Sequence, residues 1–184
     1  MTFKEAVKSG IRNVFNFKGR ASRSEFWWFS LFLLVLELLV FVLGSGVILV
    51  IVFSIEGFIP ADISSITFAA PAVVINYAIN IIIIAIYVAN IPISIRRLHD
   101  VNKSAWWVIL WYLCYAFLYV VVEIYPANFA SIDHNHLGAW LCFLILCLWI
   151  IWAIVLLVFC VKKGTQGNNR FGADPLDLSA QEVK

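Results

Sequence analysis

Arginine and carboxylate side chains recur in three short charged segments of a 184-residue chain that is otherwise mostly apolar. The residues in these segments that can pair with a charge or bind an anion are Arg20, Arg23, Glu25, Arg96, Arg97, His99, Asp100, Arg170 and Asp174. Arginine has a planar guanidinium that binds carboxylate or phosphate through two parallel hydrogen bonds. Two functions suit this chemistry: an internal network of ion pairs, or a binding site for an anionic headgroup or phosphate.

Acid–base catalysis is a third interpretation, because Asp100 follows His99 directly. Neighbouring residues on one helix do not face each other, so this pair would need a turn to act together. The sequence places no nucleophilic Ser or Cys and no paired carboxylates beside them. Residues 133–136 contain two His and an Asp, but three ligands on one loop are more typical of a solvated turn. We therefore expect no catalytic residues, no cofactor and no metal site.

Composition places these charged segments in a membrane protein. Hydrophobic residues make up 63% of the chain and charged residues 13%, and the mean hydropathy is +0.94. The net charge of +2 is too small to indicate a nucleic-acid partner. Four apolar runs, at about 27–53, 72–95, 106–125 and 137–161, are each long enough to cross a hydrocarbon core of roughly 30 Å. We expect an all-α membrane protein that folds as a four-transmembrane-helix bundle.

The distribution of charge predicts how this bundle lies in the membrane. Six Lys and Arg precede the first apolar run, three lie between the second and third, and four follow the last, whereas residues 54–71 and 126–136 contain none. By the positive-inside rule, both termini face the cytoplasm. Apolar residues at three- and four-residue intervals in 1–25 predict an amphipathic helix on the membrane surface, with a solvated, frayed tail as the alternative. We expect one membrane domain at 1–175 and a tail at 176–184.

Polar residues also occur inside the predicted spans. Asn76, Asn80, Tyr87 and Asn90 share one face of the second span, and we expect this stripe to face the bundle interior. Glu37 lies about 15 Å deep in the first span, where Tyr87 is its most suitable partner. The acid either joins two helices through a hydrogen bond or relays protons or ions. We favour the structural role, because no second ionisable residue lies at a comparable depth.

Three motifs coincide with the charged segments. They are Gly-Arg-x-x-Arg-x-Glu-Phe-Trp at 19–27, Arg-Arg-Leu-His-Asp-x-x-x-Ser-x-Trp-Trp at 96–107 and Asn-Arg-Phe-Gly-x-Asp-Pro at 169–175. In this order they resemble the bacterial inner-membrane family catalogued as domain of unknown function 805. Ala105 stands where Gly is also usual, and Ala173 stands where Pro is common. The resemblance implies a four-helix inner-membrane protein and no particular activity.

The last motif lies in a Gly-rich segment, residues 164–175, that has no hydrophobic periodicity. We expect this segment to form a strap that folds back under the bundle. Phe171 would be its apolar anchor, and Arg170 and Asp174 would make its polar contacts.

These observations favour a non-enzymatic component of the inner membrane. Its cytoplasmic Arg, Glu, His and Asp cluster is expected to brace the bundle and to bind anionic lipid headgroups or a partner protein. The expected partners are membrane lipids and either a second copy of the chain or an unknown protein. One alternative is a small oligomeric transporter or channel that uses Glu37 and the stripe from Asn76 to Asn90 as a path. A second is an enzyme that acts on a lipid or phosphate compound at the inner leaflet.

Overall fold

The computed structural model describes residues 1–56, 61–124 and 136–177, of which 51–56, 61–70, 118, 120–124 and 136–142 are described by their backbone only. The elements are α1 (Phe3–Arg12), α2 (Arg23–Glu56), α3 (Ala61–Asp100), α4 (Trp106–Ile124) and α6 (His136–Val161). The described residues contain no β-strand. The prediction of an all-α fold is confirmed.

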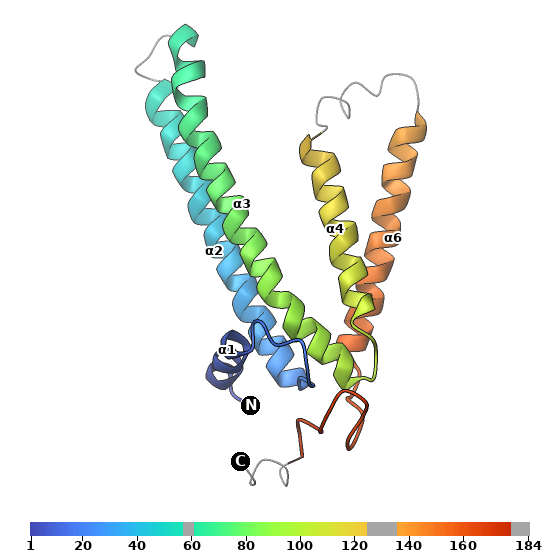
Figure 1. Ribbon diagram of the computed structural model, residues 1–184. Helices are drawn as coiled ribbons and strands as arrows, with labels where there is room; N and C mark the ends of the chain where they lie inside the picture. Colours follow the sequence, from blue (N-terminus) through green and yellow to red (C-terminus); the bar gives the residue numbers. More distant parts are fainter. Residues whose placement is uncertain (57–60, 125–135, 178–184) are drawn as a thin grey trace.

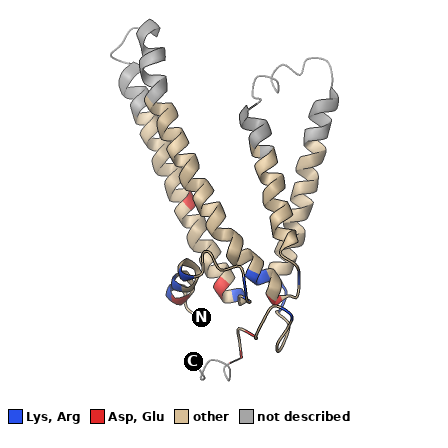
Figure 2. Cartoon of the chain, in the orientation of Figure 1, with Lys and Arg blue, Asp and Glu red and all other residues tan. Residues whose placement is uncertain are grey.

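The four long helices form two arms (Figure 1). Helices α2 and α3 lie side by side in one arm, and α4 and α6 form the other. The arms meet where α2 and α4 begin and where α3 and α6 end, and they diverge away from this point. We call the meeting point the joined end. Helix α1 and the strap also lie there, so every charged segment of the sequence is gathered at one end of the molecule (Figure 2).

The helices have the length and composition of membrane spans. Within the described residues, three helices are long and apolar enough to cross a membrane, at Arg23–Val50, Pro71–Asp100 and Phe143–Val161. Many of their large apolar side chains are exposed, as expected of helices that lipid surrounds. In α4 the described apolar stretch, Trp106–Phe117, is shorter. Three predicted spans are therefore confirmed as suitable helices, and the fourth stays a prediction.

Helix α1 packs on the first turns of α2. Its N-terminus has a capping box, in which the Thr2 hydroxyl accepts from the Glu5 backbone N–H and the Glu5 carboxylate accepts from the Thr2 backbone N–H. The hydrogen bond from the Thr2 backbone N–H to the carboxylate, and after it the Thr2 side chain, lower the pKa of Glu5. Ala6 and Gly10 are buried, and a Cβ at Gly10 would overlap the ring of Phe29. Only glycine therefore permits this close approach of α1 to α2.

The buried apolar core lies at the joined end. Phe29 of α2, Leu98 of α3, Val108 of α4 and Cys160 of α6 belong to one cluster of buried side chains, so all four long helices contribute to it. Away from this core the arms separate (Figure 1). The joined end is the part of the molecule where side chains can be held in a fixed arrangement.

Helix α3 extends past the apolar run that predicted the second span at about 72–95. It continues to Asp100, and the turn to α4 occupies only residues 101–105, where Asn102 adopts a φ of 58°. Arg96, Arg97, His99 and Asp100 therefore form the last turn of a helix. The helix continues because the residues of its final turn are buried and paired with other segments. An apolar run in the sequence, by contrast, ends at its first charged residue, so it does not show where the helix ends.

Candidate functional site

Arg97 connects the two arms at the joined end. Its side chain is fully buried, and its Nε donates to the carbonyl oxygen of Cys160 at 3.0 Å. Its Nη2 donates to the carbonyl oxygen of Lys162, and its Nη1 pairs with the carboxylate of Asp100. The last carbonyl groups of a helix have no partner within that helix. Arg97, which belongs to α3, thus satisfies the end of α6.

Asp100 lies between three segments of the chain. Its carboxylate accepts from Arg20 Nε at 3.0 Å and also pairs with Arg97. Its backbone carbonyl accepts from the Thr165 N–H at 2.8 Å and from the Thr165 hydroxyl at 3.1 Å. A Cβ at Gly164 would overlap the Asp100 carboxylate, so the strap can approach this closely only through glycine. One residue therefore joins α3, the segment before α2 and the strap.

Arg20, in the segment before α2, connects Asp100 to the strap. Its side chain is almost fully buried, and besides Asp100 it donates to the carbonyl oxygens of Gly167 and Thr165 in the strap. It also lies 3.9 Å from Asp174. The Asp174 carboxylate itself accepts from the backbone N–H of Gly167 at 3.0 Å. Arg20 thus holds the strap through backbone groups more than through charge.

Arg96 is paired on one side only. Its Nη1 contacts Glu25 Oε1 at 3.2 Å, and the same carboxylate oxygen accepts from the Ser9 hydroxyl at 2.9 Å, which ties α1 to the cluster. The Arg96 carbonyl accepts from the backbone N–H of Ala21 at 3.1 Å. The Nε and Nη2 of Arg96 are buried and have no hydrogen-bond partner among the described residues. This guanidinium keeps two donors for another acceptor.

His99 points away from Asp100, toward the strap. Its ring stacks on Phe171, with the ring centroids 3.9 Å apart and the planes 7° from parallel. Its Nδ1 donates to the carbonyl oxygen of Gly19 at 3.2 Å. Asn169 Nδ2 donates to the His99 carbonyl at 2.9 Å. His99 and Asp100 therefore have separate partners and are not arranged as an acid–base pair.

Two of the predicted arginines stand apart from the ion pairs. Arg170 donates to the carbonyl oxygen of Asn102 at 3.2 Å and lies 4.6 Å from the Phe171 ring centroid. Arg23 is exposed at the start of α2. Neither makes a salt bridge within the described part of the chain. The other predicted cations and acids of the cluster are all paired there.

Several residues of this site were not predicted. Ser9, Thr165 and Asn169 supply hydrogen bonds that hold the cluster, and Gly10 and Gly164 permit close approach. Asn169 belongs to the last motif, so its position was a usable signal. No group of three or more His, Cys, Asp or Glu is placed to hold a metal ion among the described residues. The loop residues 133–135 lie outside the described residues.

A second polar group lies partway along the α2–α3 arm. Tyr87 donates to Glu37 Oε1 at 2.7 Å, which is the contact expected from their depths. Ser30 of α2 donates to Asn90 Oδ1 of α3 at 3.4 Å. Asn80 Nδ2 donates to the carbonyl of Asn76 in its own helix at 2.9 Å, and Asn80 Oδ1 accepts from the hydroxyl of Tyr119 on α4 at 3.3 Å.

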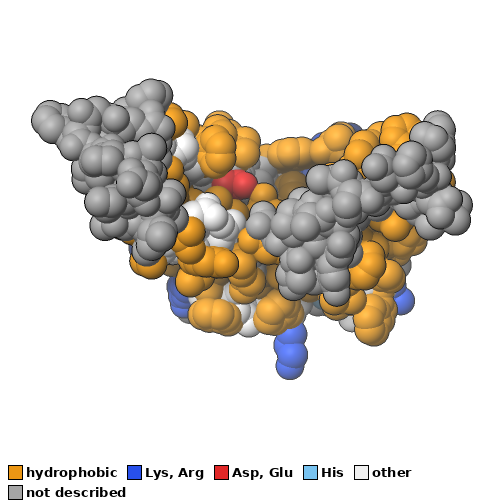
Figure 3. Space-filling model, turned by 90° about the horizontal axis from the view of Figure 1, so that it is seen from above, with side chains coloured by type: hydrophobic (Ala, Val, Ile, Leu, Met, Phe, Trp, Pro, Cys, Tyr) orange, Lys and Arg blue, Asp and Glu red, His pale blue; other side chains and the backbone are white. Residues whose placement is uncertain are grey.

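At the far end of the stripe Asn76 is exposed. Its Oδ1 accepts from Asn80 Nδ2 at 3.3 Å, and its orientation toward the bundle interior stays a prediction. Seen from above, the molecule is hollowed between the arms, with an acidic side chain visible in the hollow (Figure 3).

Comparisons with known proteins agree on a membrane family. A family model described as "Protein of unknown function (DUF805)" matches residues 14–129, which is more than half of the chain. The first two motifs fall inside this match, and the strap lies beyond it. No solved structure gives a significant match.

Two curated relatives come from Escherichia coli strain K12. Inner membrane protein YhaI is 23% identical over 167 residues, which cover 91% of this chain and 92% of the relative. Inner membrane protein YhaH is 26% identical over 165 residues, which cover 90% of this chain and 91% of the relative. The likeness to both proteins therefore extends over nearly the whole chain.

Proposed function

The chain belongs to the DUF805 family of proteins of unknown function, and on that premise we propose that it is a non-enzymatic, multi-pass protein of the bacterial inner membrane. In this proposal α2, α3, α4 and α6 are the four spans and the joined end faces the cytoplasm. The Lys and Arg distribution supports this orientation, because all thirteen lie before α2, at its first residue, at the end of α3, between α3 and α4, or after α6 in the sequence.

The cluster at the joined end braces the two helical hairpins against each other. The observation that carries this proposal is Arg97, a fully buried cation of one hairpin that donates to two backbone carbonyls at the end of the other. Because Asp100 neutralises Arg97 and also contacts Arg20, the charges are compensated where they are buried. The arrangement is a fixed clamp between hairpins.

The same end binds anionic phospholipid headgroups. Two observations support this part of the proposal. Arg23 is exposed and makes no salt bridge within the described residues, and Arg96 keeps two buried donors without a partner there. In addition, Phe3 and Ile11 on α1 are 45% and 58% exposed, which suits a helix that lies on the lipid surface.

Mass spectrometry of the protein extracted gently from the membrane tests this function. We expect the intact protein to retain anionic phospholipid in preference to zwitterionic phospholipid of the same chain length. Protein that carries neither, or both in the ratio found in the membrane, would overturn the binding part of the proposal. The same spectra give the number of subunits, since a second copy of the chain is a proposed partner.

The hydrogen bond between Tyr87 and Glu37 favours a second candidate, a small oligomeric transporter or channel. Glu37 is half-buried in the middle of a proposed span, and its partner lies on the neighbouring helix. Flux of protons or ions into vesicles that contain the purified protein tests this candidate. Flux that a Glu37→Gln variant abolishes would support it, and vesicles no leakier than lipid alone would remove it.

A further inference from the structure

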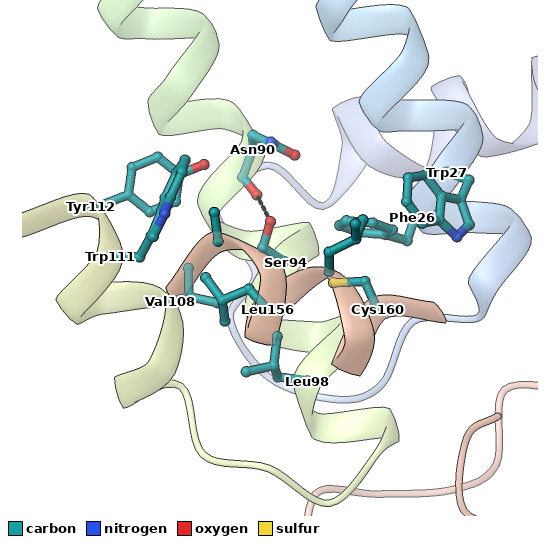
Figure 4. A pocket seen from close by; sticks show the side chains of 12 residues that line it. Phe26, Trp27, Asn90, Ser94, Leu98, Val108, Trp111, Tyr112, Leu156 and Cys160 are labelled. Carbon is teal, nitrogen blue, oxygen red and sulfur yellow. Dashed lines mark hydrogen bonds between the residues drawn. The ribbon is translucent and has the colours of Figure 1, made fainter. Parts of the chain in front are cut away.

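A mainly apolar pocket of about 200 Å³ lies where the four long helices meet (Figure 4). Its walls include Phe26 and Trp27 of α2, Leu98 of α3, Val108 of α4, and Leu156 and Cys160 of α6. A dry apolar cavity of about 150 Å³ is enough to hold a benzene molecule. This pocket can therefore take a segment of hydrocarbon chain.

A second, polar pocket of about 130 Å³ lies at the joined end and contains two cations without partners. Arg23 and Lys163 line it, and both are exposed and make neither a salt bridge nor a hydrogen bond within the described residues. Ser22 and Gln166 also line this pocket and can donate hydrogen bonds to an acceptor.

Two carboxylates share the polar pocket, but both are already engaged. Asp100 pairs with Arg20 and Arg97. Asp174 accepts backbone N–H groups from Gly167 and Leu176, each at 3.0 Å. The charge left for a ligand is therefore positive, and a phosphate is the group that complements it.

The two pockets adjoin along the same pair of helices. Arg23 lies four residues before Trp27 on one face of α2, so one helical turn of about 5.4 Å separates the polar lining from the apolar lining there. On the other side, Lys163 follows three residues after Cys160, just beyond the end of α6. At both helix ends the cations are therefore within about one helical turn of the apolar lining, which suits an amphiphile with an anionic head.

We propose that one anionic phospholipid binds between the start of α2 and the end of α6, with its phosphate against Arg23 and Lys163 and part of one acyl chain in the apolar pocket. This inference rests on the proposed function, which sets the joined end at the cytoplasmic leaflet, and it locates the lipid site. The guanidinium of Arg23 binds the two non-bridging oxygens of the phosphodiester, and the Lys163 ammonium contacts one of the same oxygens. Inorganic phosphate would fill only the polar half of the site.

Titration with phosphatidylglycerol, followed by native mass spectrometry of the full chain in detergent, tests the site. The test variant is Arg23→Gln with Lys163→Gln, and the control is Lys8→Gln with Lys18→Gln, which removes the same charge from exposed positions of the N-terminal segment. We expect the test variant to bind phosphatidylglycerol about tenfold more weakly or worse, at about one tenfold factor per 1.4 kcal/mol. We expect the control to bind like the wild-type protein.

A third variant tests the apolar half. Ala153→Leu adds side-chain volume to a wall of the apolar pocket, and Leu156→Phe is a second such change in case the first does not fold. We expect weaker phosphatidylglycerol binding with no change in the response to inorganic phosphate. Equal binding by a folded pocket variant and the wild-type protein would overturn the acyl-chain part of the site.

The outcomes separate this inference from the proposed function. If the wild-type protein binds no anionic lipid, the proposed binding function fails and this inference fails with it. If the wild-type protein binds and the test and control variants behave alike, the location is wrong while the function stands. If inorganic phosphate at millimolar concentration displaces the lipid completely and Ala153→Leu has no effect, the site is one for a free anion, which also overturns the proposal.

Discussion

Arg97 of α3 donates a hydrogen bond to the carbonyl oxygen of Cys160 in the last turn of α6, a residue 63 positions later in the chain. This bond crosses between the two arms at the end where the buried core lies. The acceptor of this bond is a backbone carbonyl. The bond therefore depends on the residue at which α6 ends and not on the type of side chain at residue 160.

Replacement of Arg97 by Ala is expected to destabilise the protein strongly. The change removes the cation that pairs with Asp100 and leaves the buried carbonyls of Cys160 and Lys162 without donors. Breaking a buried ion pair costs about 3–5 kcal/mol, and because Asp100 keeps Arg20, we expect about 3 kcal/mol. Thermal unfolding of the purified protein measures this. Arg170→Ala, at an exposed position, is the control and is expected to cost less than about 1 kcal/mol. Equal unfolding temperatures would contradict the clamp.

Gly164→Ala is expected to destabilise the joined end through a steric clash. The added Cβ would overlap the Asp100 carboxylate, which cannot swing aside because Arg20 and Arg97 hold it. Overpacking of this kind costs about 1–3 kcal/mol. Gly46→Ala in α2 is the matched control, because nothing lies within 4 Å of its added Cβ. We expect it to be neutral or to stabilise by up to about 1 kcal/mol. A Gly164→Ala variant as stable as the Gly46→Ala control would show that the strap does not approach Asp100 closely.

Tyr87→Phe is expected to weaken the contact between α2 and α3. It removes the hydroxyl that donates to Glu37 and leaves the ring in place. Hydrogen bonds between helices in a membrane contribute roughly 0.6–2 kcal/mol, so a loss in that range is expected on unfolding. Tyr77→Phe removes a hydroxyl from a side chain that is 65% exposed on the same helix, and it should have little effect. Identical stability of the two variants would mean that Glu37 does not rely on Tyr87.

Phe171→Ala is expected to release the strap from the joined end. The substitution abolishes the stack on His99, whose ring centroid lies 3.9 Å from that of Phe171. Local opening then exposes the peptide bond after Arg170, so trypsin should cut the strap several-fold faster while the helices stay intact. Leu176→Ala, at a side chain that is 73% exposed, is the control. An unchanged cleavage rate in the Phe171 variant would show that Asn169 and Thr165 hold the strap without the stack.

Single cysteines report the orientation in the membrane. In a background in which the four native cysteines are replaced, a cysteine at Lys103 should react with a membrane-impermeant thiol reagent only after the cells are opened. A cysteine at Asn135 should react in intact cells, because the segment 126–136 has no Lys or Arg to hold it inside. Labelling of Asn135→Cys only from the cytoplasmic side would overturn the proposed topology.

The sequence predicted which charged side chains lie close together, but not which hydrogen-bond partner each of them has. The charges of Arg20, Arg97 and Asp100 were enough to predict that these residues lie at the same end of the molecule, because a membrane protein keeps its charges at the ends of its spans. The depths of Glu37 and Tyr87 likewise predicted a contact that is present. The acceptors at Cys160 and Lys162 are backbone carbonyls. A sequence gives no sign of which carbonyl will be left at a helix end, so these partners could not be predicted.

The separation of the arms could not be predicted either. The long helices are apolar on every side, so their hydrophobic pattern does not specify which face meets a neighbour. The prediction of a four-helix bundle rested on the four apolar runs, and these do not show how far along their length the helices stay in contact. Helix α3 continues past the predicted span, because burial and pairing of its last turn outweigh the charge that ended the apolar run.

The two-armed shape means that a small tilt at the joined end produces a large displacement at the far ends of the arms. Helix α3 has 40 residues and is therefore about 60 Å long, so a tilt of about 10° at the joined end moves its far end by about 10 Å. The arms also touch where Tyr119 of α4 donates to Asn80 of α3, but the buried core that fixes them lies at the joined end. A small change in what fills the space there is therefore enlarged with distance. The contents of the pocket beside Trp27 would thus set the spread of the arms on the opposite side of the membrane.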